Sequence, residues 1–370
     1  MAPTLELRDP EVCPVPPNGF LGRMFDGIVS DKRDLVFVRF VLTIMLTVWP
    51  LAVLQFVWFK WWIAIPYAIM VGRWNGPVTL MLHNTSHRPL FKRMRWMNDI
   101  IPTVITPFFG NTPYTYYSHH VGMHHPENNL EDDLSSTMKY QRDSFLGFLH
   151  YYLRFMTLTI FELPSYLFKK KRTRLAWRAF LGEVFFFAFV AAMVRIEWRA
   201  ALVVFIVPYA MMRFGMMAGN WGQHAFVDAA RPESPYANSI TCINSPYNAS
   251  CFNDGYHIGH HLVASTHWTE YPGELRKNQA KYAKEDAIVF AGTDFFVVSF
   301  ALWFGRYQWL AKKYVQLGED VLTQEQIITK LKSRLTPIVR DRAVLAAQRE
   351  AARKARRLEA ATPTGDEAAA

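Results

Sequence analysis

The chain has 370 residues, of which 51% are hydrophobic and 15% aromatic, and Lys and Arg outnumber Asp and Glu by 41 to 31. Its apolar residues stand in runs long enough to cross a bilayer, which favours a membrane protein over a set of soluble domains. The basic excess flanks these runs and no nucleic-acid-binding module is recognisable, so we expect anionic lipid or an acidic partner and no nucleic acid. The three cysteines form no CxxC pair, which argues against a disulfide framework and favours a reducing environment.

The first half of the chain predicts one membrane hairpin. A polar segment, residues 1–34, precedes a long apolar run at 35–59. A weaker run follows at 61–82, because Arg73 and a polar Asn-Gly-Pro stretch interrupt it. Lys and Arg residues stand before the first run and after the second. By the positive-inside rule, both ends of this hairpin are expected in the cytosol.

A second hairpin is expected from the apolar runs at 179–194 and 200–219, which a short charged turn joins. Two other apolar runs, 145–168 and 287–305, carry charged residues, and Ile100–Gly110 is too short to span. If 145–168 spanned, histidine-rich segments before and after it would face opposite sides of the membrane. We therefore interpret 145–168 and 287–305 as interfacial segments.

These elements predict an all-α fold: a multipass membrane helical bundle of about four spans in two hairpins, with a cytosolic helical cap. We divide the chain into a cytosolic N-terminal segment (1–34), a membrane domain (35–317) and a polar C-terminal part (318–370). Within the last part, Ala343–Ala361 is rich in Arg, Glu, Lys and Ala and predicts a solvated helix, followed by a disordered tail.

Histidines gather in four patches along the chain, and only His150 of the 12 lies outside them. The patches are an HxxxH, an HHxxxHH, an NxxxH and an HxxHH followed by one further histidine. Their members are His83 and His87; His119, His120, His124 and His125; Asn220 and His224; and His257, His260, His261 and His267. Residues three or four apart share a helix face, so two such imidazoles can reach one metal ion.

The number of imidazoles exceeds what one ion can use, so two ions are expected. Adjacent histidines on a helix point about 100° apart, and such a pair can serve two ions side by side. Imidazole suits iron, zinc, copper and nickel. Structural zinc sites are smaller and commonly contain cysteine. Spacing alone does not separate a di-iron site from a di-zinc or di-manganese site.

Several residues keep alternative roles at this point. His119 is a ligand in place of His120, a hydrogen-bond donor that supports a ligand, or a surface residue. Asn220 is a ligand or contacts the metal through water, and His267, outside the helical spacing, is expected to be structural. Nearby carboxylates could orient imidazole N–H groups or be ordinary surface charges. They are Asp132, Asp133, Asp228, Asp254 and Glu270.

The HxxxH, HxxxHH and late HxxHH, in this order between two hairpins, resemble the signature of the integral-membrane fatty acid desaturases and related hydroxylases. The NxxxH is similar to the extra patch of the acyl-CoA type. The resemblance covers roughly residues 35–275. It implies two iron ions on the cytosolic side of a four-span bundle. The implied metal-binding residues are His83, His87, His120, His124, His125, Asn220, His224, His257, His260 and His261.

The resemblance further implies an O₂-dependent desaturase that places a double bond in an acyl chain. The sequence contains no HPGG haem motif and no flavin or NAD fingerprint, so we expect an external electron carrier of the cytochrome b5 or ferredoxin type. The site would face the cytosol, at the endoplasmic reticulum of a eukaryote or the inner membrane of a bacterium. One alternative is a hydroxylase of fatty acids, sterols or alkanes. Another is a non-catalytic metal-binding membrane protein.

Overall fold

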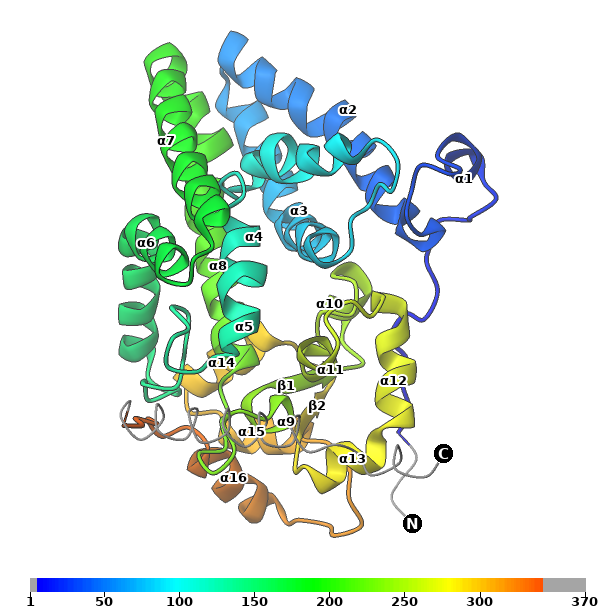
Figure 1. Ribbon diagram of the computed structural model, residues 1–370, viewed down its shortest axis with the longest axis vertical. Helices are drawn as coiled ribbons and strands as arrows, with labels where there is room; N and C mark the ends of the chain where they lie inside the picture. The colour runs from blue at the N-terminus through cyan, green and yellow to red at the C-terminus, as the bar shows by residue number, and fades with distance from the viewer. Residues whose placement is uncertain (1–4, 342–370) are drawn as a thin grey trace, which may run out of the picture.

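The computed structural model describes residues 5–341. The helix expected at 343–361 and the tail expected to be disordered lie outside these residues. The described chain is mostly helical, as predicted, with long helices gathered at one end of the molecule and short helices around two strands at the other (Figure 1).

Helices α2 (Leu35–Val57) and α3 (Trp61–His87) form the first hairpin, in agreement with the prediction. The chain reverses at Trp58–Lys60, where the ring of Trp58 contacts that of Trp62 at a centroid distance of 5.8 Å. Helix α3 is longer than expected and continues through the first histidine patch to His87.

The second hairpin consists of α7 (Thr173–Ala201), a π-helical segment (Leu202–Ile206) and α8 (Val207–Gln223). Glu197 has non-helical backbone angles (φ −153°, ψ 98°), so α7 turns back at the charged segment where the sequence predicts the turn. Helix α8 returns alongside α7, in the register given by three side-chain pairs. These are Glu183 with Arg213, Phe186 with Tyr209, and Phe189 with Phe205.

The tips of the two hairpins lie against each other. The Arg199 guanidinium lies 4.8 Å from the centre of the Phe59 ring and also forms an ion pair with Glu197 at 2.7 Å. Below the tips, the Phe205 ring contacts the Phe56 ring at 6.2 Å. These contacts join the long helices into one bundle, which Figure 1 shows at the top of the molecule.

Two helical stretches of the described chain, Lys32–Val57 and Thr173–Gln223, are long and apolar enough to cross a membrane. The second stretch contains both helices of the second hairpin. Helix α3, which carries Arg73 and Asn75, is not among them.

Between the hairpins, the chain forms short helices and the long α6 (Phe145–Lys169), which packs along α7. The short elements are α4 (Thr115–His119), α5 (His125–Glu127), two 3-10 segments (Arg95–Asp99 and Thr106–Phe109) and two π-helical segments (Ile101–Ile105 and His120–His124). The outer face of α6 is apolar: Leu146 and Phe161 are 75% and 63% exposed. An apolar outer face is consistent with the interfacial position expected for this run.

The C-terminal half contains a feature that the all-α prediction missed, a parallel pair of strands. Strand β1 (Ile240–Ile243) pairs with β2 (Ile288–Ala291), with Ile240 opposite Ile288. The run at 287–305, expected at the membrane interface, instead provides β2 and then α14 (Phe295–Trp303). The interfacial prediction is wrong for the strand, because Val289 and Phe290 are fully buried in the protein core.

Short helices surround this sheet (Figure 1). They are α9 (Pro235–Asn238), α10 (Pro246–Ser250), α11 (His257–Leu262), α12 (Tyr271–Lys277), α13 (Gln279–Lys284), α15 (Tyr307–Lys313) and α16 (Gln324–Ser333), with a 3-10 segment at Trp268–Glu270. Helix α16 begins with a capping box at Thr323 and buries Ile327 and Leu331 in the core around the strands.

The N-terminal segment contains α1 (Phe20–Met24) and a 3-10 turn (Lys32–Asp34), and it packs beside the fourth histidine patch. The buried Asp9 carboxylate accepts hydrogen bonds from the Asn244 backbone N–H (2.6 Å) and the Tyr256 hydroxyl (2.7 Å). Tyr256 directly precedes α11, so this segment supports the helix that carries the last histidines.

Candidate metal centre

The first histidine patch occupies the last turn of α3. His83 and His87 stand four residues apart on one face, with ring centroids 5.2 Å from each other. Because α3 continues past its apolar part to His87, its two histidine rings reach those of His120, His125 and His260.

The second patch departs from ordinary α-helical spacing, because His120–His124 form a π-helical turn. A π-turn shifts the helical spacing, and the His120 ring lies closer to the His125 ring (4.5 Å between centroids) than to the His124 ring (5.6 Å). The Nε2 atoms of His120 and His125 are 3.1 Å apart, whereas the His124 ring faces His224 and His261. The π-turn therefore directs the adjacent side chains of His124 and His125 toward different neighbours.

The fourth patch lies on the short helix α11. His257 and His261 share a face, with Nε2 atoms 3.1 Å apart. The His260 ring points away from this face, toward His83 and His125. His224 is the C-cap of α8, and its Nε2 lies 3.2 Å from that of His257. The adjacent histidines His260 and His261 thus diverge, as the helical geometry predicts.

Nine histidines gather in two clusters. One cluster, here called cluster A, contains His83, His87, His120, His125 and His260, and the other, cluster B, contains His124, His224, His257 and His261. Within each cluster the candidate ligand nitrogens all lie within 4.8 Å of one another. The clusters adjoin each other, since the rings of His125 and His261 stack at 4.9 Å.

The chemistry of this donor set fits a metal ion in each cluster. The Nε2 atom of His260 lies 2.9 Å from that of His83 and 2.8 Å from that of His125, while the buried His87 Nε2 has no hydrogen-bond partner. Inward-facing nitrogen lone pairs at such separations repel one another unless a cation lies between them. Deprotonated imidazole nitrogens are the ligands that iron and zinc accept.

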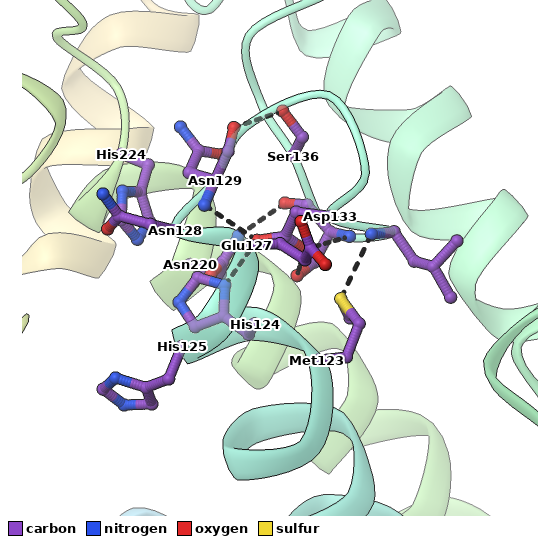
Figure 2. A network of polar contacts seen from close by, with 12 residues as sticks. Met123, His124, His125, Glu127, Asn128, Asn129, Asp133, Ser136, Asn220 and His224 are labelled. Atoms are coloured by element: carbon purple, nitrogen blue, oxygen red, sulfur yellow. Dashed lines mark hydrogen bonds and ion pairs between the residues drawn. The ribbon is translucent and has the colours of Figure 1, made fainter. Parts of the chain in front are cut away.

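The outer nitrogens of four rings have partners that leave Nε2 facing inward. The Nδ1 atoms contact Asp133 Oδ2 (2.7 Å, His124), the Asn238 carbonyl (2.9 Å, His224), the Tyr271 hydroxyl (3.2 Å, His260) and Asp254 Oδ1 (3.4 Å, His83). Partners of this kind fix the tautomer of a metal-binding histidine. Figure 2 shows His124 directed toward Asp133, with the His125 ring turned away from that network.

Burial keeps the three histidine rings of α11 neutral. Burial, followed by repulsion from neighbouring imidazoles, holds the pKa of His257, His260 and His261 well below the ordinary value. For Asp133, burial raises the pKa, but His124 and the Ser135 hydrogen bond outweigh burial and lower the pKa to about 2. Neutral imidazole is the form of histidine that binds a metal.

Of the five carboxylates noted in the sequence, two contact the histidines. Asp133 and Asp254 do so, whereas Asp132 pairs with Lys170 and Glu270 with Arg33. The fifth, Asp228, lies near Arg231 at 3.5 Å. Sequence reasoning did not find Asn238 or Tyr271, and one of these contacts is made by a backbone carbonyl, which leaves no trace in residue identity.

Three other residues of the patches lie apart from the two clusters. The buried His119 ring packs edge-on against Phe155, and its Nε2 has no partner. The Asn220 amide donates to the Ser135 carbonyl (3.0 Å) and to the Tyr151 hydroxyl (2.7 Å). His267 contacts Asp34 at 3.1 Å and caps the turn at Thr269, which is the structural role expected of it.

A cavity of about 310 Å³ reaches the two clusters from between α3 and α8. At one end it is bounded by His83, His120, His124, His257 and Asp254, and at the other by glycines and methionines of the two helices. The arrangement combines a buried pair of possible metal positions with a channel-like space beside them.

Comparison with known families agrees with this geometry. The family model described as "Fatty acid desaturase" matches residues 56–293. The chain belongs to this family. Its members are membrane-associated oxidoreductases of the di-iron type. No curated protein and no solved structure matches the chain.

Proposed function

We propose that this desaturase-family protein is an O₂-dependent di-iron fatty acyl desaturase. The observation that carries the proposal is the pair of adjoining histidine clusters at the end of a cavity between two long helices. Cluster A would hold one iron ion and cluster B the other. The rings of His124, His125, His260 and His261 contact one another across the two clusters, so the two ions would lie next to each other. Asn220, which lines the cavity, is proposed to act through water.

The chemistry requires a redox-active metal because no side chain alone can break an unactivated methylene C–H bond. Bound iron would supply the means to reduce O₂ while two hydrogens leave the acyl chain. In the balanced reaction, –CH₂–CH₂–, O₂, two electrons and two protons yield –CH=CH– and two water molecules. The two electrons come from an external donor.

The protein's own residues would hold the metals and exclude bulk water. Asp133, Asp254, Tyr271 and Asn238 orient the four rings that they contact. The rings of His120, His124 and His257 are at most 9% exposed, which shields the reaction from solvent. Such shielding protects reactive species from side reactions.

The membrane arrangement supports an acyl substrate. We infer four spans, formed by α2, α3, α7 and α8, with the histidines on the cytosolic side, because Lys and Arg residues follow α3 and precede α7. Trp58, Trp61, Trp62 and Trp198 are more than half exposed at the hairpin tips, as expected of rings at the far membrane interface.

The electron donor is proposed to be a small acidic protein of the cytochrome b5 or ferredoxin type. Basic residues on the same side as the histidines, such as Lys171 and Arg174, would attract it. The proposed location is the endoplasmic reticulum in a eukaryote or the inner membrane in a bacterium.

The test is product analysis with iron-loaded protein in lipid vesicles, supplied with a reductant chain and O₂. Desaturation predicts an acyl product lighter by two hydrogens, formed with consumption of one O₂ per double bond. A product with one added oxygen would instead show the hydroxylase alternative. Protein that binds zinc alone from iron-fed cells and consumes no O₂ would show a non-catalytic metal-binding protein.

A further inference from the structure

The cavity that reaches the metal centre has glycines along both of its helical walls. Helix α3 contributes Gly72 and Gly76, and α8 contributes Gly215 and Gly219. Each pair stands four residues apart, so both glycines of a pair lie on the face toward the cavity. Since glycine has no side chain, these positions leave open the space between α3 and α8.

The two ends of this cavity differ in exposure. The residues at the metal end are buried: His83 is 7% exposed, and His124 and His257 are 2% exposed. At the other end Met211 is 50% exposed, and a Cβ added to Gly215 would meet no atom within 4 Å. The Met211 side chain lies 3.6 Å from where a Cβ on Gly72 would stand. Met211 therefore covers an otherwise open end between the helices.

The pairing of α7 with α8 shows how deep in the membrane the Met211 end of the cavity lies. Met211 lies between Tyr209, which stacks on Phe186, and Arg213, which pairs with Glu183. The outward residues of α7 at the same level, Val184 and Phe185, are apolar and 42% and 67% exposed. An exposed apolar band of this kind on a family of membrane-associated proteins faces lipid. The end covered by Met211 therefore lies at the depth of the lipid chains.

We propose that the acyl chain enters this cavity sideways from the bilayer, between α3 and α8, and that Met211, Gly72 and Gly215 form the entrance. This inference rests on the proposed desaturase function. It assigns the substrate class, an acyl chain carried by a membrane lipid, in place of a water-borne thioester that enters from the cytosol. The entrance lies about 16 Å from His83 along α3, at about 1.5 Å per residue.

The test is photo-crosslinking with the full-length, iron-loaded protein in vesicles, without reductant. The probe is phosphatidylglycerol with a diazirine midway along one acyl chain, and mass spectrometry maps the labelled peptides. We expect labels on residues 72–83 of α3 and 211–223 of α8. Gly215→Phe should lower this labelling about tenfold, because its ring fills apolar space that the chain would occupy. Met211→Ala should raise labelling, which keeps the test informative if the bulky variant does not fold.

Gly273→Phe is the matched control, since an added Cβ there also meets no atom within 4 Å and the position lies on α12, away from the cavity. It should label like the unmodified protein. The proposal is overturned if the lipid probe leaves both helices unlabelled, or if Gly215→Phe and Met211→Ala leave labelling unchanged. Labelling by a diazirine acyl-CoA probe alone would also overturn it. None of these outcomes depends on turnover, so product analysis tests the desaturase function separately.

Discussion

The Nδ1 atom of His124 lies 2.7 Å from the Asp133 carboxylate, and this contact decides which nitrogen of His124 faces cluster B. Asp133 also accepts hydrogen bonds from the Asn129 backbone N–H (Figure 2) and from the Ser135 backbone N–H. The carboxylate is therefore held in place before any metal binds. A rigid partner of this kind prearranges the ligand.

Replacing this carboxylate should weaken the metal in cluster B. Asp133→Asn keeps the size of the side chain but removes its charge, so we expect metal affinity to fall about 10–100-fold, the usual effect of losing such a partner. Metal titration of the purified protein measures this change. The neighbouring Asp132→Asn, which loses a contact with Lys170 instead, serves as control and should bind metal normally. Equal affinity in both variants would contradict the assigned role of Asp133.

Adjacent histidines should control different ions. His260 belongs to cluster A and His261 to cluster B. His260→Ala should therefore empty mainly cluster A, and His261→Ala mainly cluster B, because each removes one imidazole from one donor set. Metal analysis should give about half of the iron for either variant, since the protein would keep one of two ions. Iron content that stays full in both variants would argue against two separate sites.

The double histidine of the second patch has one expected ligand. His120→Gln should lower the iron content, because the His120 Nε2 lies in cluster A at 3.1 Å from His125 Nε2. His119→Gln should keep both ions, since the His119 ring packs on Phe155 outside the clusters. The iron-to-protein ratios of the two variants, measured side by side, decide the point. The reverse pattern would assign the ligand to His119.

The buried Glu183–Arg213 pair should be important for stability. Both side chains are at most 3% exposed, and Thr112 donates a 2.6 Å hydrogen bond to Glu183. Glu183→Ala would leave Arg213 buried without its counter-ion and should cost about 3–5 kcal/mol. Thermal unfolding in detergent measures the loss. The double variant Glu183→Leu with Arg213→Met removes both charges and should unfold at a higher temperature than the single variant.

Much of this site follows from residue spacing alone. The HxxxH at His83 and His87 needs only the local geometry of an α-helix, and the sequence predicts this pair directly. The same local rule separates His260 from His261, because neighbouring side chains on a helix diverge. The two hairpins are equally readable, since long apolar runs and charged turns are local features of the chain.

The second patch shows where local rules stop. Its spacing suggests that His120 pairs with His124, but the π-helical turn pairs His120 with His125. A π-turn is not favoured by residue type alone and depends on the packing around it. The parallel strands were missed for a related reason. Ile240 and Ile288 pair across a long separation in the chain, and the spacing of hydrophobic residues within one segment does not reveal such a pairing.

By itself, the sequence determined that the chain carries nine histidines at metal-binding spacing, on helices that follow two apolar hairpins. Only the tertiary structure decided how these histidines divide into two clusters, and that Asp133, Asp254, Asn238 and Tyr271 hold their rings. The physical reason is the distance along the chain over which each kind of interaction acts. Helical spacing fixes which side chains share a face within a few residues, whereas a metal site forms where separate elements pack together.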